Sequence, residues 1–115
     1  MITVHGIPNC DTVKKARTWL TDHGVAHVFH DFKKQGVPTA ALDRWLAAAG
    51  WETVINRKGT TWRQLDEATR SAVDGPGPAR ALALENPSVI KRPVVEWADG
   101  SITVGFDAVD WQRRI

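Results

Sequence analysis

The sequence has a single cysteine, Cys10, among its 115 residues. One cysteine cannot form an intramolecular disulfide, so no disulfide stabilises the fold. Redox chemistry at Cys10 also needs a second thiol from another molecule. A thiol reaction at this residue therefore has to be completed from outside the chain.

Long apolar runs and an excess of charge of one sign are also absent. No apolar run approaches membrane-spanning length, and the N-terminus, MITVHGIPNC, lacks the charged start and long apolar stretch of a secretion signal. The formal net charge is +2, and the 24% of residues that are charged mix both signs, which does not indicate nucleic acid or a membrane as the main partner. We therefore expect a cytoplasmic protein that binds neither.

The length of 115 residues, 43% of them hydrophobic, fits one domain with a single core. Met1 to His5 form a β-branched run that predicts a strand, and residues 6–9 are turn residues. Apolar side chains then recur at helical spacing until Gly24 ends the helix, and residues 25–30 alternate as a second strand. After a crossover of this length, the two strands should be parallel.

The middle of the chain predicts an inserted helical segment, at about residues 38–86. Residues 31–37 form a polar loop, and Pro38 is suited to be the first residue of a helix that Gly50 ends. Residues 51–74 predict short helical pieces, with Thr61 and Gln64 at the spacing of a capping box.

The breaker cluster Gly75-Pro76-Gly77-Pro78 ends this region, and a further helix follows over residues 79–85. The C-terminal part predicts two strands, residues 94–97 and 101–104, joined in a tight hairpin at Asp99-Gly100. Asp107 then opens a short last helix. The predicted fold is a thioredoxin-like α/β sandwich, a single domain over residues 1–115 with the helical insertion.

Two prolines bracket the stretch ENPSVIKRPVV, residues 85–95. The chain is expected to leave a helix at Pro87 and to begin a strand after Pro93. The spacing alone leaves the isomer of the Arg92-Pro93 bond open, since an X-Pro bond adopts cis at low cost. Together with a cysteine at a helix start, the arrangement matches thioredoxin-like folds and favours cis.

Cys10 lies where the loop after the first strand meets the following helix. Unpaired backbone N–H groups and the helix dipole at this position favour a thiolate over a thiol. A cysteine that only caps the helix or packs in the core is the alternative. The charge of Asp11 opposes a thiolate, whereas Lys14 and Lys15 either offset it or form a solvated face.

Three motifs resemble the arsenate reductase family, in particular its small proteins similar to YffB and, more distantly, the Spx regulators. They are GIPNCDTVKKAR at residues 6–17, Asn56-Arg57, and ENPSVIKRPV at residues 85–94. The likeness covers nearly the whole chain. It implies that Cys10 is the nucleophile and that Pro93 is the cis proline beside the thiol.

The resemblance further implies that Arg57 and Arg92 hold an oxyanion or the carboxylate of a thiol cosubstrate, and we place Asn9 beside them in the binding site. Guanidinium groups suit this role because they make bidentate, charge-assisted hydrogen bonds to such anions. For Arg57, a surface salt bridge is an equally good interpretation.

Three positions differ from the family patterns. Arsenate reductases of the family have a further arginine in the hairpin region, but Gly105-Phe106-Asp107 contains none. The histidine that they place shortly before the cysteine is Gly6 here. The third residue after Cys10 is Val13, which excludes the Cys-x-x-Cys switch of Spx regulators.

The leading functional hypothesis is a glutathione-dependent thiol-disulfide reductase with a single nucleophilic cysteine. Glutathione is the expected cosubstrate, no bound cofactor is expected, and glutathione or a glutaredoxin resolves the adduct on Cys10. A protein disulfide is a possible substrate. The alternatives are a regulatory module of Spx type that binds a protein such as RNA polymerase, and a true arsenate reductase.

Two other groups of residues were considered as sites. His23, His27 and His30 span a helix end and a strand, so we interpret them as surface residues and expect no metal site. The six tryptophans fall mostly on apolar faces and are interpreted as core residues, with Trp51 or Trp62 as candidates to line the active-site cleft.

Overall fold

The computed structural model describes residues 1–115, which divide into two compact units. The first unit combines Met1–Gln35 with Arg92–Ile115, and the second is Gly36–Lys91. The predicted helical insertion lies within the second unit. No helix in either unit has both the length and the apolar character needed to cross a bilayer.

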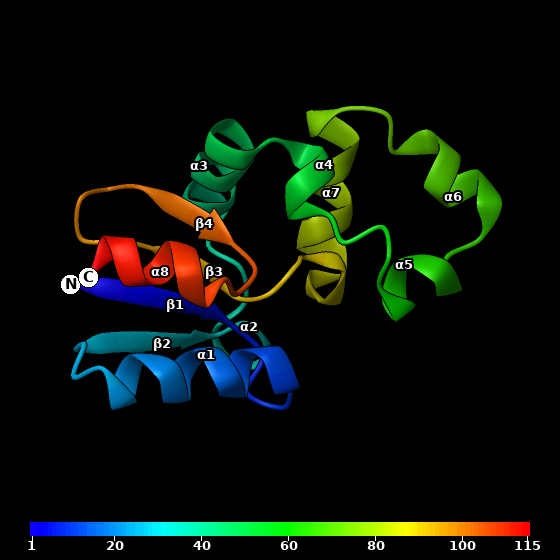
Figure 1. Ribbon diagram of the computed structural model, residues 1–115. Coiled ribbons are helices and arrows are strands. Elements are labelled where there is room, and N and C mark those ends of the chain that lie inside the picture. Colours follow the sequence, from blue (N-terminus) through cyan, green and yellow to red (C-terminus); the bar gives the residue numbers. More distant parts are fainter. The chain divides into compact units, whose positions relative to one another are not determined.

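The first unit contains a four-stranded sheet in the order β2-β1-β3-β4. Strands β1 and β2 are parallel, whereas β1 with β3 and β3 with β4 are antiparallel. This arrangement, visible in Figure 1, is the predicted thioredoxin-like fold. The elements of this unit are β1 (Ile2–Gly6), α1 (Asp11–Asp22), β2 (His27–Asp31), α2 (Phe32–Gln35), β3 (Val94–Glu96), β4 (Ile102–Val104) and α8 (Ala108–Arg114).

The core of the first unit lies between one face of the sheet and the helices α1 and α8. Alternate strand residues share a face, and Val4 of β1 is paired with Val95 of β3 on this one. Ala16 and Leu20 of α1 and Trp111 of α8 pack against it and are fully buried. The apolar residues that predicted α1 by their helical spacing are therefore those on the face of the helix that packs against the sheet.

Aromatic contacts position α8 on the sheet. The ring of Trp111 lies edge-on to Trp97, at a centroid distance of 5.1 Å, and to Phe106, at 4.7 Å. Edge-to-face pairs at such distances are favourable beyond the apolar area that they bury. Trp111 is thus the residue through which the last helix is held to the core.

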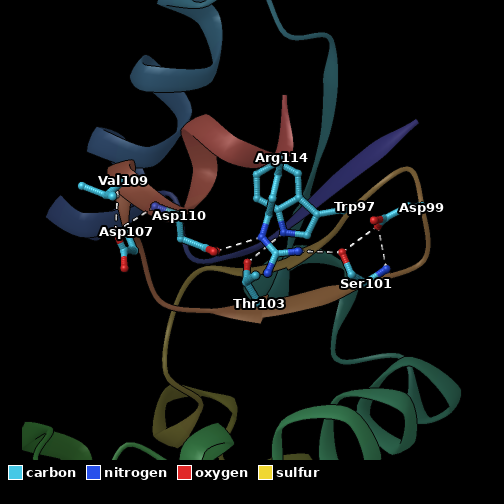
Figure 2. Close-up of polar contacts among 8 residues, drawn as sticks. All are labelled: Trp97, Asp99, Ser101, Thr103, Asp107, Val109, Asp110 and Arg114. Atoms are coloured by element: carbon cyan, nitrogen blue, oxygen red, sulfur yellow. Dashed lines mark hydrogen bonds and ion pairs between the residues drawn. The ribbon is translucent and has the colours of Figure 1, made fainter.

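Polar contacts cap the start of α8 and attach its C-terminal end beside β4 (Figure 2). The carboxylate of Asp107 accepts hydrogen bonds from the backbone N–H groups of Val109, at 3.1 Å, and Asp110, at 3.2 Å. Arg114 donates to Asp110 at 2.8 Å and to the hydroxyl of Ser101, beside β4, at 2.9 Å. The predicted N-cap at Asp107 is confirmed.

The second unit consists of short helices: α3 (Thr39–Ala49), α4 (Trp51–Val54), α5 (Thr60–Gln64), α6 (Glu67–Ala72), α7 (Pro76–Glu85) and the 3-10 helix η1 (Pro87–Val89). Ile55 and Ile90 form an isolated antiparallel bridge between the segments after α4 and η1. On either side of it, Asn56 N–H donates to the Val89 carbonyl and Lys91 N–H to the Val54 carbonyl, both at 2.8 Å. The predicted succession of short helical pieces is confirmed.

Residues 31–37 are not the polar loop that was predicted. Asp31 belongs to β2, and Phe32–Gln35 form α2. The Asp31 carboxylate accepts a hydrogen bond from the backbone N–H of Lys33 at 2.8 Å, which supports the first turn. Pro38 is the N-cap of α3 rather than its first residue.

Two predictions about helix starts in the second unit were wrong. Thr61 and Gln64 both lie inside α5, whose N-cap is Gly59, so they do not form a capping box. The helix predicted to begin at residue 79 begins at Pro76, because proline is tolerated in the first turn, where its missing N–H has no helical partner. The side-chain cap in this region is Asp66, which accepts from Thr69 N–H at 2.8 Å.

Candidate active site around Cys10

Cys10 is the N-cap residue of α1, in extended backbone conformation at φ −138° and ψ 124°. The residue is half-buried, so part of it is open to solvent. The loop between β1 and Cys10 delivers the residue to the helix start, as predicted. A thiol at this position is exposed to the positive end of the helix dipole.

The pKa of the Cys10 thiol is lowered, which is the predicted direction. Partial burial by itself raises this pKa, because it disfavours the charged form. Hydrogen bonding from the backbone of Val13 and Thr12 and the hydrogen bond and positive charge of Arg92 outweigh the burial. The site therefore favours the thiolate, which is the nucleophilic form of cysteine.

Arg92 and Pro93 reach this site through the pairing of β3 with β1. The guanidinium of Arg92 lies beside the Cys10 thiol, and the Arg92-Pro93 peptide bond is cis, as predicted. Pro93 is buried, and its carbonyl accepts a hydrogen bond from Gly105 N–H at 2.8 Å. The loop after β4 therefore borders the same site.

The charged neighbours of Cys10 on α1 are not among the groups that lower its pKa most. Asp11, Lys14 and Lys15 are exposed, and the lowering comes from Arg92 and the backbone. The exposure of Lys14 and Lys15 agrees with a solvated face. Asn9 is exposed in the bend that precedes Cys10, and its role in binding stays a prediction.

Arg57 belongs to the second unit, where its guanidinium interacts with α4. It donates to the carboxylate of Glu52 at 3.1 Å and lies over the ring of Trp51, 5.4 Å from the centroid. Its side chain is 47% exposed, so this ion pair contributes little to stability. The surface salt bridge considered from the sequence is present, and a role toward a bound anion stays a prediction.

Close packing leaves no room for a side chain at Gly6. A β-carbon at Gly6 would lie 2.9 Å from Cγ2 of Val13, closer than such atoms approach in proteins. Val13 is fully buried in α1. A larger side chain at position 6 would therefore push α1, and Cys10 at its start, away from β1.

A pair that was not predicted from the sequence lies on the other side of β1, between the buried His5 and the half-buried Glu96. Nε2 of His5 lies 2.8 Å from a carboxylate oxygen of Glu96 on β3. The His30 ring is 5.0 Å from the His5 ring. Strand alternation was the available signal, since His5 is out of phase with Val4 and so faces away from the α1 side.

The three histidines considered as metal ligands have separate surroundings. His23 is exposed, stacks on Trp19 at a centroid distance of 3.9 Å, and donates from Nδ1 to the Trp19 carbonyl. Nδ1 of His27 donates to the Val25 carbonyl at 2.9 Å. His30 is half-buried on the sheet rather than at the surface.

The sheet topology and the site together define a thioredoxin-like domain with one cysteine, of lowered pKa, at the start of its first helix. Residues 5–113 match the model of the ArsC family. The chain belongs to the ArsC family, as the resemblance of its motifs predicted.

Two solved structures and one curated relative illustrate this membership. The structure of a YFFB protein is 47% identical, with a TM-score of 0.93, over 99% of this chain and 98% of that one. The structure of an arsenate reductase (ArsC) related protein from Brucella melitensis is 50% identical, with a TM-score of 0.77, over 97% and 92% of the two chains. The global transcriptional regulator Spx of Streptococcus agalactiae is 30% identical over 83% of this chain and 69% of the regulator.

Proposed function

We propose that this protein is a glutathione-dependent thiol-disulfide reductase in which Cys10 is the nucleophile. The observation that supports this most directly is the Arg92 guanidinium beside the half-buried Cys10 thiol, whose pKa is lowered. A thiolate that is both stabilised and accessible is suited to attack a disulfide sulfur. The cytoplasm is the proposed compartment, because glutathione there keeps thiols reduced.

The reaction proceeds by two thiol-disulfide exchanges at Cys10. In the first, the thiolate attacks one sulfur of a substrate disulfide, forming a mixed disulfide and releasing the other sulfur as a thiolate that takes up a proton. In the second, a glutathione thiolate attacks the mixed disulfide and returns Cys10 to its thiolate form. A further glutathione reduces the remaining disulfide, so two glutathione molecules become one oxidised glutathione and the substrate gains two electrons and two protons.

The proposed role of Arg92 is to bind a glutathione carboxylate while it stabilises the Cys10 thiolate. A guanidinium presents several N–H donors, so it can serve two anionic groups at once. Arg57 and Asn9 are proposed as further contacts to glutathione. A glutaredoxin is an alternative to glutathione in the second exchange, and a protein disulfide is the proposed natural substrate class.

The test follows Cys10 through the exchanges. Incubation of the protein with oxidised glutathione should yield a glutathione adduct on Cys10, detected by peptide mass spectrometry, that reduced glutathione removes. Turnover is measured with a small disulfide as substrate, in an assay coupled to glutathione oxidation. The Cys10→Ser variant is the control in both experiments, because it should form no adduct and should not turn over the disulfide. Absence of the adduct, or equal turnover by the variant, would refute the proposal.

A regulatory module that binds a protein partner is the second candidate. It is favoured by the 30% identity to the Streptococcus agalactiae protein named a global transcriptional regulator. The buried Val13 at the third position after Cys10 excludes an intramolecular Cys-x-x-Cys disulfide as the switch of such a module. If Cys10 forms no adduct while a transcription protein binds the chain, this candidate replaces the reductase.

A further inference from the structure

Two neighbouring hollows on the first unit share Trp19 and lie along α1 and α8. The first, of about 430 Å³, is lined by Lys14, Lys15, Thr18, Trp19, Asp22 and Phe106. The second, of about 480 Å³, is lined by Trp19, Ala108, Val109, Gln112 and Arg113. We call the two hollows together the Trp19 surface. None of its residues has a role in the proposed chemistry at Cys10.

The centre of the Trp19 surface is apolar and partly open to solvent. Trp19 is half-buried, with its ring edge-on to Trp111 at 5.8 Å and to Phe106 at 6.3 Å. Val109, on α8, is 68% exposed. Aromatic and aliphatic groups gathered at an open hollow are typical of a surface that another molecule covers.

The margins of the Trp19 surface carry unpaired positive charge. Lys14 and Lys15 line one hollow and Arg113 the other, and none of the three forms an ion pair. Asp22 is the one acidic residue in the lining. The nearby Asp110 is paired with Arg114, so its charge is compensated.

The surface is preformed because α8 is held to the first unit by the buried Trp111 and, at its C-terminal end, by the hydrogen bond from Arg114 to Ser101. Figure 2 shows the Val109 side chain pointing away from the contact of Arg114 with Ser101, which ties the helix to the hairpin. Trp111, in the same helix, is fully buried in the core. A partner would therefore lose little affinity to ordering of the protein on binding.

We propose that the Trp19 surface binds an acidic segment of another protein, with apolar side chains of that segment in the two hollows. Negative charge on the partner complements Lys14, Lys15 and Arg113, and apolar side chains cover Trp19 and Val109. A second copy of this chain is disfavoured, because a two-fold interface would bring the same basic margins together. The proposal is independent of the proposed reductase function.

The test uses two synthetic peptides and the full-length Cys10→Ser variant, so that no reaction at the thiol intervenes. One peptide places leucine and phenylalanine among glutamates, and the other has lysine in place of each glutamate. Chemical-shift mapping by NMR should show that the acidic peptide moves the Trp19 indole N–H and the amides of Phe106 and Val109. Its affinity should weaken as salt is added.

Charge reversal provides the matched comparison. Lys15→Glu with Arg113→Glu should weaken binding of the acidic peptide several-fold. Lys33→Glu with Lys34→Glu changes the charge equally on α2, outside the surface, and should leave binding unchanged. A Val109→Ser variant should weaken binding without affecting the core.

Three outcomes of the peptide experiments would overturn the proposal. They are the absence of shifts at the Trp19 surface, equal binding of both peptides, and equal loss of binding in both charge-reversal variants. A fourth outcome is a dimer of this chain. Sedimentation at the NMR concentration would detect it, and chemical shifts that change on dilution would place its interface at Trp19 and Val109. Failure of any of these tests leaves the exchange chemistry at Cys10 unaffected.

Discussion

The guanidinium of Arg92, just before β3, hydrogen-bonds to the thiol of Cys10, at the start of α1. Antiparallel pairing of β3 with β1 brings these distant parts of the sequence together. The positive charge arrives where the backbone at the helix start already favours an anion. The two influences together overcome the effect of burial on the pKa of Cys10.

Replacing Arg92 should therefore raise the pKa of Cys10. Arg92→Ala removes both the hydrogen bond and the charge, whereas Arg92→Lys keeps a charge and should raise the pKa less. The rate of alkylation by iodoacetamide, measured against pH, reports the thiolate directly. Lys91→Ala, at an exposed position with no ion pair, is the control. An unchanged titration in Arg92→Ala would contradict the assigned cause.

The lowered pKa of Cys10 also predicts a pH-dependent stability. The unfolded chain has a cysteine pKa of about 8.5, and the folded value lies below its ordinary level. The resulting stabilisation is fully present above the unfolded pKa and is lost as the pH falls through the folded pKa. Urea unfolding of the wild type and of Cys10→Ser should thus show a difference that grows with pH across this window. A difference that is independent of pH would argue against a lowered pKa.

Adding one methyl group at Gly6 should destabilise the protein. The β-carbon would meet Val13 at 2.9 Å, and overpacking of this kind costs about 1–3 kcal/mol. Val13→Ala should relieve the clash, so the double variant should lose less stability than the sum of the single variants. The free energy of unfolding in urea gives all three values.

Gly77→Ala is the matched control for Gly6→Ala. Gly77 lies in α7 with open space around the position of a β-carbon. Gly77 precedes Pro78, and a β-carbon before proline is disfavoured in helical backbone, so Gly77→Ala should cost some stability but less than Gly6→Ala. Equal destabilisation at both glycines would mean that the contact with Val13 is not the cause.

Loss of the cap at Asp107 should loosen α8. Asp107→Ala removes the acceptor for the backbone N–H groups of Val109 and Asp110 and should cost about 0.5–2 kcal/mol. Asp107→Ser keeps an acceptor and should cost less. Thermal unfolding and hydrogen exchange of the α8 amides measure the effect. Asp74→Ala, at an exposed acid without such bonds, should have little effect.

Local signals in the sequence determined much of the first unit. Gly24, at φ +68°, ends the first helix, Gly100, at φ +87°, turns the hairpin, and Asp107 caps the last helix. The two glycines act through their own backbone conformation, and the aspartate acts through hydrogen bonds to residues next to it in the chain. For the same reason, the position of Cys10 at a helix start predicted the direction of its pKa shift.

Family motifs extended the prediction to contacts that local signals do not contain. Nothing in the residue types pairs Arg92 with Cys10, but the resemblance placed both at one site, and the structure brings them together. The start of α7 was misplaced because proline and glycine are usual in loops and yet fit a first helical turn. In that case, the local signal was ambiguous.

Only the tertiary structure decided the remaining relationships. The contact that excludes a side chain at Gly6, the pairing of His5 with Glu96, and the Trp19 surface each join segments that are separate in the sequence. Periodicity indicates that a residue faces the core or the solvent, but not which residue it meets there. Those partners follow from strand register and helix packing, which are set by the burial of the whole core.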